Sequence, residues 1–287
     1  MASPHISYSE ISDYRTCPHK HRLAWKDRWR PAVAAPAPAK GTLFHQVMAQ
    51  HYRTLQATQN NDLFTVMPTP ETLLAAADIM MGDNEHAELV HWMYEGYLEM
   101  WGTDPQWRIV EVEQRDSFWL PTAWGSRSHT LLVTVTDLVV EDEMERLWLV
   151  DHKTGANLPN EFELDLDDQF TLYQWGLNQQ GRRIHGIIYN SARTQRNKTP
   201  MLLTDRFRRL PLYRTDEQCR NTAIDAWRTA RRAAAAKPGT EERALGAVPC
   251  LRPWRCEFAE ACLWARKGGD EEDFLASSGF TKQLSHS

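Results

Sequence analysis

Two aspartates and a lysine stand where two successive apolar segments end. Asp137 lies near the end of the alternating segment 130–140, and Asp151 follows the next apolar run, with Lys153 two positions later. If the two segments are adjacent strands, the two carboxylates lie side by side. A hard divalent cation with oxygen ligands, such as Mg2+ or Mn2+, stabilises such a pair of anions.

These three residues offer a defined chemistry. Lys153 shares a face with Asp151, because side chains alternate along a strand. Carboxylates that hold a metal, together with an ammonium group that can position or deprotonate water, are the minimum for metal-assisted phosphodiester hydrolysis. A structural ion pair at the end of a strand would account for the same residues.

The segment before these residues is expected to be mostly helical. Ser7-Tyr8-Ser9-Glu10 has the pattern of a capping box, which predicts a helix from Ser7 toward Cys17. The Ala/Pro alternation of residues 31–40 predicts an extended linker. Gly41 then precedes a predicted amphipathic helix that carries His45 near its start, and a helical pattern returns over residues 70–101.

The middle of the chain is expected to form a central sheet. Short runs rich in Val, Leu, Trp and Thr alternate with helical patterns, which favours a mixed α/β sheet flanked by helices. The predicted strands are 109–120, 130–140, 147–151, 184–189 and 202–210, and the predicted helices are 165–180 and 215–236. We expect one nuclease-like domain over 1–287, with a helical part (1–105), a core (106–212) and a C-terminal helix and tail (213–287).

Charge is distributed unevenly along the 287 residues. The formal net charge is -5, but residues 181–240 hold 14 Lys and Arg against four acidic residues, a net charge of +10 that leaves -15 for the remainder. A basic wall for phosphates beside carboxylates for metal suits a nuclease, although a solvated, Arg-rich helical face would look the same. The sequence has no apolar run of about 20 residues and no signal-peptide pattern, so we expect a soluble cytoplasmic protein.

Five cysteines form a second pattern. Cys250, Cys256 and Cys262 follow one another at intervals of six, Cys17 stands near the other end, and Cys219 is left over. In a reducing compartment clustered thiols are interpreted first as metal or cluster ligands. A four-thiolate zinc site is an alternative, although tight Cys-x-x-Cys pairs are absent from the sequence. Unligated burial best suits Cys219.

The order of these motifs resembles the PD-(D/E)XK nuclease superfamily, and specifically its RecB-like, AddB-type branch with an iron-sulfur cluster. Gly-rich phosphate loops and His-Glu-x-x-His or Gly-x-Ser-x-Gly motifs do not occur in the sequence. The matching pieces are Ser7 to Pro18 with its Cys-Pro end, Gly41-x-x-x-His45, Thr136-Asp137, Asp151-His152-Lys153-Thr154-Gly155, Gln169-x-x-x-Tyr173 and the Cys-rich tail.

The resemblance assigns roles to individual residues. It implies that Asp137 and Asp151 are catalytic metal ligands, that the His152 carbonyl and His45 are further ligands, and that Lys153 is the catalytic lysine. The metal would be Mg2+ or Mn2+.

Residues on two further elements are implicated as well. Gln169 and Tyr173 lie four apart, on one face of a helix, and the family uses these positions to contact DNA near the scissile phosphate. Glu111 and Glu113 on the first predicted strand are candidates for an accessory carboxylate, of which Glu113 is the weaker.

The resemblance also assigns the cysteines. It implies a structural 4Fe-4S cluster held by Cys17, Cys250, Cys256 and Cys262. Five residues separate Cys250 from Cys256, whereas the family more often has two between the first pair of the tail. If Cys250 is not the fourth ligand, His19 or His21, close to Cys17, is the next candidate.

The implied function is that of a metal-dependent DNA exonuclease. It would hydrolyse phosphodiester bonds from DNA ends, with single-strand preference, in recombination, repair, replication or CRISPR adaptation. One alternative is a DNA-binding nuclease subunit of a larger assembly with a helicase or recombinase, with little activity alone. A non-catalytic iron-sulfur scaffold is a further alternative, although the sequence retains the two aspartates and the lysine.

Overall fold

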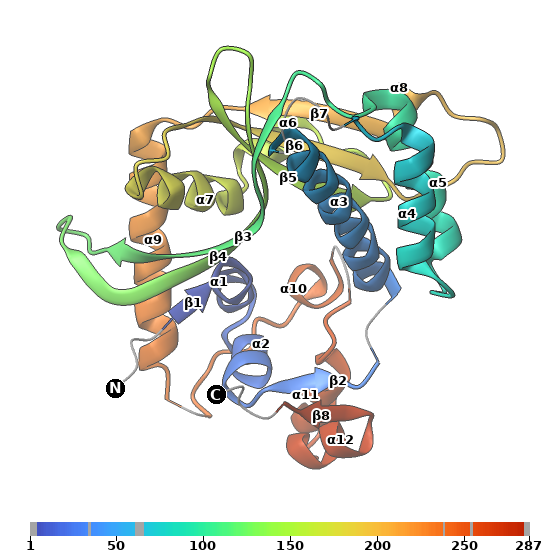
Figure 1. The fold of residues 1–287 in the computed structure, drawn as a ribbon. Helices are drawn as coiled ribbons and strands as arrows, with labels where there is room; N and C mark the ends of the chain where they lie inside the picture. Colours follow the sequence, from blue (N-terminus) through green and yellow to red (C-terminus); the bar gives the residue numbers. More distant parts are fainter. Residues whose placement is uncertain (1–4, 34–35, 61–65, 238, 253–254, 284–287) are drawn as a thin grey trace. The chain divides into compact units, whose positions relative to one another are not determined.

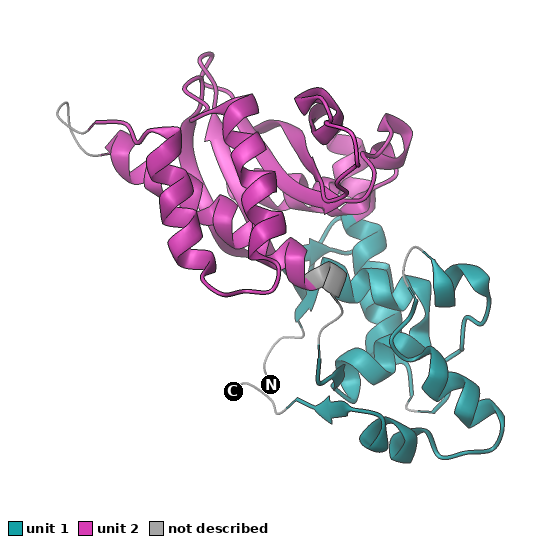
Figure 2. Cartoon of the chain, turned by 90° about the vertical axis from the view of Figure 1, so that its right-hand side faces the viewer, with its two compact units in different colours: residues 1–34, 119–133, 223–287 teal, residues 35–118, 134–222 magenta. Residues whose placement is uncertain are grey.

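The chain divides into two units, and each is made of segments that are distant in sequence (Figure 2). The computed structural model describes residues 5–33, 36–60, 66–237, 239–252 and 255–283. The first unit comprises residues 1–34, 119–133 and 223–287, and the second comprises residues 35–118 and 134–222. None of the helices in the described ranges combines the length and apolar character needed to cross a lipid bilayer.

A mixed sheet forms the centre of the second unit. Strand β4 (Arg127–Glu141) pairs antiparallel with β5 (Leu147–Gly155), and β3 (Arg108–Pro121) pairs with β4. Strand β5 pairs in parallel with β6 (Ile184–Arg193), which pairs antiparallel with β7 (Phe207–Leu212). The parallel pair requires a crossover connection, and helices α6 and α7 supply it.

Helices cover both faces of this sheet (Figure 1). On one face, Leu138 and Val150 belong to the same apolar core as helix α3 (Pro36–Asn60) and its neighbours. On the other face, Phe170 of α7 packs edge-on against Tyr189, with ring centroids 5.6 Å apart. The predicted mixed α/β fold is confirmed. The remaining helices are α4 (Pro70–Met81), α5 (Ala87–Trp101), α6 (Glu161–Asp165), α7 (Asp168–Gln179), α8 (Leu203–Arg206) and α9 (Asp216–Ala235).

The first unit joins the N-terminal segment to the C-terminal tail. A small core contains Leu23 and Trp29 from one and Phe258 and Leu275 from the other. Strand β2 pairs antiparallel with β8, and β1 pairs in parallel with the first part of β4. Its elements are β1 (His5–Ser7), α1 (Tyr8–Thr16), α2 (Pro18–His21), the π-helical turn η1 (Arg22–Lys26), β2 (Trp29–Pro31), α10 (Ala247–Leu251), α11 (Ala259–Arg266), α12 (Glu271–Ser277) and β8 (Phe280–Lys282).

The start of α1 agrees with the predicted cap in part. Ser7 Oγ accepts the Glu10 backbone N–H at 3.2 Å, as an N-cap should. The second half of a capping box is replaced by another contact, because the Glu10 carboxylate lies 3.0 Å from His21 Nε2. The sequence therefore located the helix but not the partner of Glu10.

The predicted linker over residues 31–40 is wrong in its second half. Helix α3 begins at Pro36, so Gly41 lies inside the helix instead of preceding it. Proline fits the first turn of a helix, where its missing N–H costs nothing. Gly41 allows α3 to approach β5 closely, since a Cβ added there would lie 3.2 Å from Thr154 Oγ1.

The second unit contains a buried ion pair between Arg209 and Asp104. The Arg209 guanidinium donates to both oxygens of Asp104, at 2.5 and 2.8 Å, and lies about 4 Å from the ring centres of Trp101 and Trp107. Asp104 is fully buried and also accepts a hydrogen bond from Tyr52 at 2.7 Å. Removal of one partner from such a pair leaves an uncompensated buried charge.

We therefore expect Asp104→Ala to lower the free energy of unfolding by about 3–5 kcal/mol, measured by urea denaturation. Asp83→Ala is the matched control, because Asp83 is exposed, and it should change stability by less than about 0.5 kcal/mol. Equal denaturation midpoints for the two variants would show that the Arg209 pair does not stabilise this unit.

Candidate active site and cysteine cluster

The predicted catalytic aspartates come from neighbouring strands. The pairing of Leu138 with Val150 in the β4–β5 register puts Asp137 beside Asp151. Asp137 Oδ2 accepts the His152 backbone N–H at 2.8 Å and lies 3.2 Å from His45 Nδ1. The structure therefore brings Asp137 together with His45, which lies 92 positions earlier in the sequence.

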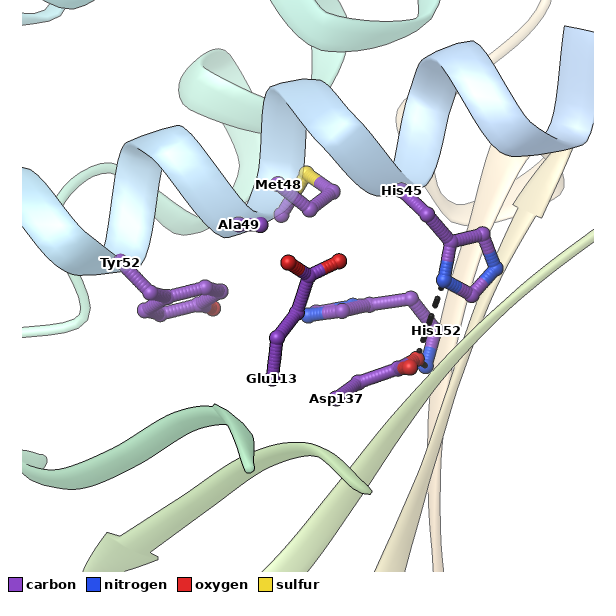
Figure 3. A pocket seen from close by; sticks show the side chains of 7 residues that line it. All are labelled: His45, Met48, Ala49, Tyr52, Glu113, Asp137 and His152. Carbon is purple, nitrogen blue, oxygen red and sulfur yellow. Dashed lines mark hydrogen bonds and ion pairs between the residues drawn. The ribbon is translucent and has the colours of Figure 1, made fainter. Parts of the chain in front are cut away.

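His45 reaches this site from α3. It lines a narrow pocket with Met48, Ala49, Tyr52, Glu113, Asp137 and His152, and its ring faces the Asp137 carboxylate (Figure 3). The spacing between Gly41 and His45 is one helical turn, so both residues lie on the side of α3 that approaches β5. Close contact at Gly41 is what lets the imidazole reach the strand.

Lys153 contacts Asp151 and does not line the pocket that contains His45. Its Nζ is 2.8 Å from Asp151 Oδ2 and donates to Gln169 Oε1 at 3.2 Å. Gln169 Nε2 in turn donates to Tyr173 Oη at 3.2 Å. Gln169 and Tyr173, the two helix residues predicted to contact DNA, thus form a hydrogen-bonded row that ends at the predicted catalytic Lys153.

Burial and charge set the protonation of these groups in different directions. Burial raises the pKa of Asp151, and the negative charge of Asp137 adds to this effect. Burial alone would also raise the pKa of Asp137, but the hydrogen bond and positive charge of His45 bring it below the usual range. Burial opposes the charge of Lys153, yet the adjacent Asp151 raises the pKa of the lysine and keeps it protonated.

The two glutamates of β3 behave differently from each other. Glu111 forms an ion pair with Arg182 at 2.8 Å and does not line the pocket. Glu113 does line it, and Arg53 holds its carboxylate at 2.7 Å. Glu113 has a left-handed backbone, with φ of 46°, which breaks the alternation of the strand. The weaker sequence candidate is therefore the one that lies in the pocket.

The His152 side chain leads into a buried polar network that the sequence analysis missed. Its Nδ1 accepts a hydrogen bond from Asn190 Nδ2 at 2.8 Å, and the ring stacks on Tyr52 with centroids 5.5 Å apart. Asn190 Nδ2 also donates to Tyr97 Oη at 3.0 Å, which connects the network to Arg209. Burial lowers the pKa of His152 to about 3, so its ring is neutral. In the sequence, the signal for this network was Asn190, a single polar residue that follows the apolar run of β6.

The side chains of the pocket suit a divalent metal ion by their chemistry. The half-buried Asp137 and the buried Asp151 offer carboxylate oxygens, and His45 offers a ring nitrogen 3.2 Å from Asp137. Among the described residues, these three side chains do not all place a ligand atom within 4.8 Å of one another, and Asp151 Oδ2 lies 2.8 Å from Lys153 Nζ.

Three of the predicted cluster cysteines are close together in the first unit. Chiefly through burial, and with a smaller contribution from the charge of Cys17, the pKa of Cys256 is raised to about 11 and that of Cys262 to about 12. Cys250 Sγ instead faces the Ala244 carbonyl oxygen at 3.7 Å. Cys219 is buried in α9, within the other unit.

A histidine and a glutamate lie beside these thiols. His19, Cys262 and Glu271 place one ligand atom each within 4.8 Å of one another, as the one such group among the described residues. His19 Nε2 is 2.8 Å from Glu271 Oε1, and Arg22 donates to the same carboxylate at 2.7 Å. Of the two histidines considered from the sequence, His19 is the one in this group, because His21 faces Glu10.

The mixed sheet presents two aspartates and a lysine on adjacent strands, an arrangement that suits metal-assisted hydrolysis. The sequence matches the family model of the PD-(D/E)XK nuclease superfamily over residues 5–263, and the chain belongs to this superfamily. Membership indicates a metal-dependent nuclease that acts on nucleic acid.

Comparison with solved structures gives a more distant likeness. A structure titled "Crystal structure of SSO0001" is 11% identical, with a TM-score of 0.33, and the match covers 66% of this chain and 74% of that one. No curated protein matches the sequence.

We predict that Mn2+ raises the melting temperature of the wild-type protein and that Asp151→Asn abolishes this rise. Without added metal the variant should be at least as stable as the wild type, because the removal of a buried anion that Asp137 repels outweighs the loss of its ion pair with Lys153. Differential scanning calorimetry with and without Mn2+ measures both effects. Asp83→Asn, an exposed change of the same type, should retain the full metal-induced shift, and an equal shift in Asp151→Asn would remove Asp151 from the ligand set.

Proposed function

We propose that this protein is a Mg2+- or Mn2+-dependent deoxyribonuclease that digests DNA from its ends. One observation carries the proposal: Asp137, Asp151 and Lys153 lie together on adjacent strands, with His45 bound to Asp137 from the opposite helix. An ion pair with a purely structural role would not need the histidine or the row formed by Gln169 and Tyr173.

Each residue of the site has a separate role in this proposal. Asp137, Asp151, His45 and the His152 carbonyl would hold the metal, which would polarise the phosphate and activate water when bound. His152 orients Asp137 through its backbone N–H. Lys153, kept protonated by Asp151, would donate a hydrogen bond to a phosphate oxygen and stabilise its negative charge. The oxygen of the attacking water bonds to phosphorus as the P–O bond to the leaving group breaks, and the water gives up its proton to the solvent while the leaving oxygen takes one up.

Helix α7 provides the proposed contact with DNA. Gln169 is hydrogen-bonded to both Lys153 and Tyr173, so a phosphate that reaches the lysine also meets the amide and the phenol. Such contacts position a strand without reading its sequence. We therefore propose that cleavage depends on strand ends, with preference for single strands, as expected of an enzyme of recombination, repair or replication.

The cysteine cluster has a structural role in the proposal. Cys17, Cys256 and Cys262 would supply three thiolate ligands to a 4Fe-4S cluster. The fourth ligand is Cys250 as the motif implies, or His19, which already lies beside Cys262. The cluster would join two segments that share the core around Leu23 and Phe258.

Lys153→Ala should abolish cleavage of end-labelled DNA while the affinity for DNA and metal stays within about twofold, because the lysine acts on water and phosphate and carries no metal. Digestion of linear and circular, single- and double-stranded DNA with Mg2+, Mn2+ or EDTA measures turnover, and fluorescence anisotropy measures binding. Lys237→Ala, an exposed lysine, is the control and should cleave normally.

Two outcomes would contradict the nuclease assignment. Cleavage by Lys153→Ala at the wild-type rate would remove the lysine from the chemistry. A wild-type protein that binds DNA without cleaving it would instead indicate a nuclease subunit that works inside a helicase or CRISPR-adaptation assembly.

Protein purified without oxygen should be brown and contain roughly four iron atoms per chain. Ser at Cys17, Cys256 or Cys262 should bleach the colour and lower the melting temperature, because both ends of a very long loop are released. Absorbance and metal analysis check this expectation. Cys219→Ser should keep the iron, since Cys219 lies in the other unit.

The same preparations identify the fourth ligand. If Cys250→Ser loses the iron, Cys250 is the ligand. If it keeps the iron and His19→Ala loses it, His19 takes that place. Zinc alone, at about one atom per chain, would replace the cluster by a zinc site.

A further inference from the structure

A cavity with two unpaired arginines lies in the second unit, on the same face of the sheet as Lys153. It has a volume of about 470 Å3, and Arg193, Arg208 and Asn157 are among its lining residues. Within the described part of the chain, neither arginine side chain has a hydrogen-bond or ion-pair partner, and the Nε of Arg193 is buried without one. An unpartnered buried guanidinium N–H is costly unless a ligand accepts from it.

The strand register fixes the position of this cavity relative to the catalytic residues. Lys153 pairs with Ser191, and Ser191 pairs with Arg208, so the three residues form one row across β5, β6 and β7. Arg193 lies two positions beyond Ser191 and therefore projects from the same face. Neighbouring strands are about 4.8 Å apart, which puts the backbone of Arg208 about 10 Å from that of Lys153.

Polar side chains complement the two arginines. Asn157 follows β5, and Asn197 and Thr204 reach the cavity from the connection between β6 and β7. Amides and hydroxyls of this kind donate hydrogen bonds to phosphate oxygens. Asp205 also lines the cavity, so the net charge of its lining is +1.

The shape of the region favours an extended ligand. A neighbouring cavity of about 360 Å3 shares Asn197, Thr199, Pro200 and Met201 with the first and continues to Trp92. Two adjoining spaces of this size accommodate a chain of several units better than a single phosphate ion.

From these observations we infer that Arg193 and Arg208 form a phosphate subsite for the DNA strand that is being cut. The separation of about 10 Å between the two backbones places the subsite within a few nucleotides of the scissile phosphate. The inference rests on the proposed nuclease function and adds to it a second point of attachment for the substrate. That attachment would hold the strand in line with Lys153.

The test compares two double variants of equal charge. Arg193→Ala with Arg208→Ala removes the subsite, and Arg183→Ala with Arg220→Ala removes two exposed arginines from the same basic segment. Binding of a short labelled single strand is measured in EDTA over a series of KCl concentrations. Each phosphate contact on a single strand contributes about 0.7 to the slope of log affinity against log salt.

The subsite variant should lose about 1.4 from this slope and bind roughly tenfold more weakly at low salt. With Mg2+ or Mn2+ its KM should rise while kcat at saturation stays unchanged. The control variant should keep the slope of the wild type. An unchanged slope in the subsite variant, or equal losses in both double variants, would overturn the inference.

Single variants of Arg208 keep the test decisive if the double variant fails to fold. Arg208 is exposed, so Arg208→Ala should fold and lose about 0.7 of the slope, and Arg208→Lys should restore most of it, because lysine also binds phosphate as a point charge.

The two proposals fail in different ways. A wild type that cleaves DNA, with no effect of the arginines, removes the subsite alone. A wild type that binds through the arginines but does not cleave removes the nuclease proposal alone, and a wild type that binds no DNA removes both.

Discussion

The pairing of β5 with its two neighbours is the constraint on which the active site depends. Antiparallel pairing with β4 brings Asp137 to Asp151, and parallel pairing with β6 requires the crossover that delivers Gln169 to Lys153. A shift of one residue in this register would move the catalytic side chains to the opposite face of the sheet.

The two faces of β5 carry polar residues with different roles. Asp151 and Lys153 face α7, where DNA is proposed to bind, whereas the His152 ring enters the buried network of Asn190 and Tyr52. His152 links the two sides, because its backbone N–H holds Asp137 while its ring is fixed from behind. Since that ring is neutral and buried, it stabilises the backbone of the site without adding charge to it.

Sequence analysis predicted the long strands and the aspartate pair because both depend on local patterns, apolar alternation and spacing along the chain. It missed β1, β2 and β8, since three residues are too short to show a period. It ranked Glu113 below Glu111, because alternation cannot reveal a left-handed residue within a strand. Sequence analysis also could not predict the contact between His19 and Glu271, because 252 positions separate the two residues and only tertiary packing brings them together.

The small core shared by the N-terminal segment and the tail has a consequence for biosynthesis. Leu23 and Trp29 are synthesised more than two hundred residues before their packing partners Phe258 and Leu275. Contacts of such high sequence separation form slowly, and until they do the early apolar residues stay exposed. The first unit therefore completes its folding after the second unit has already been synthesised.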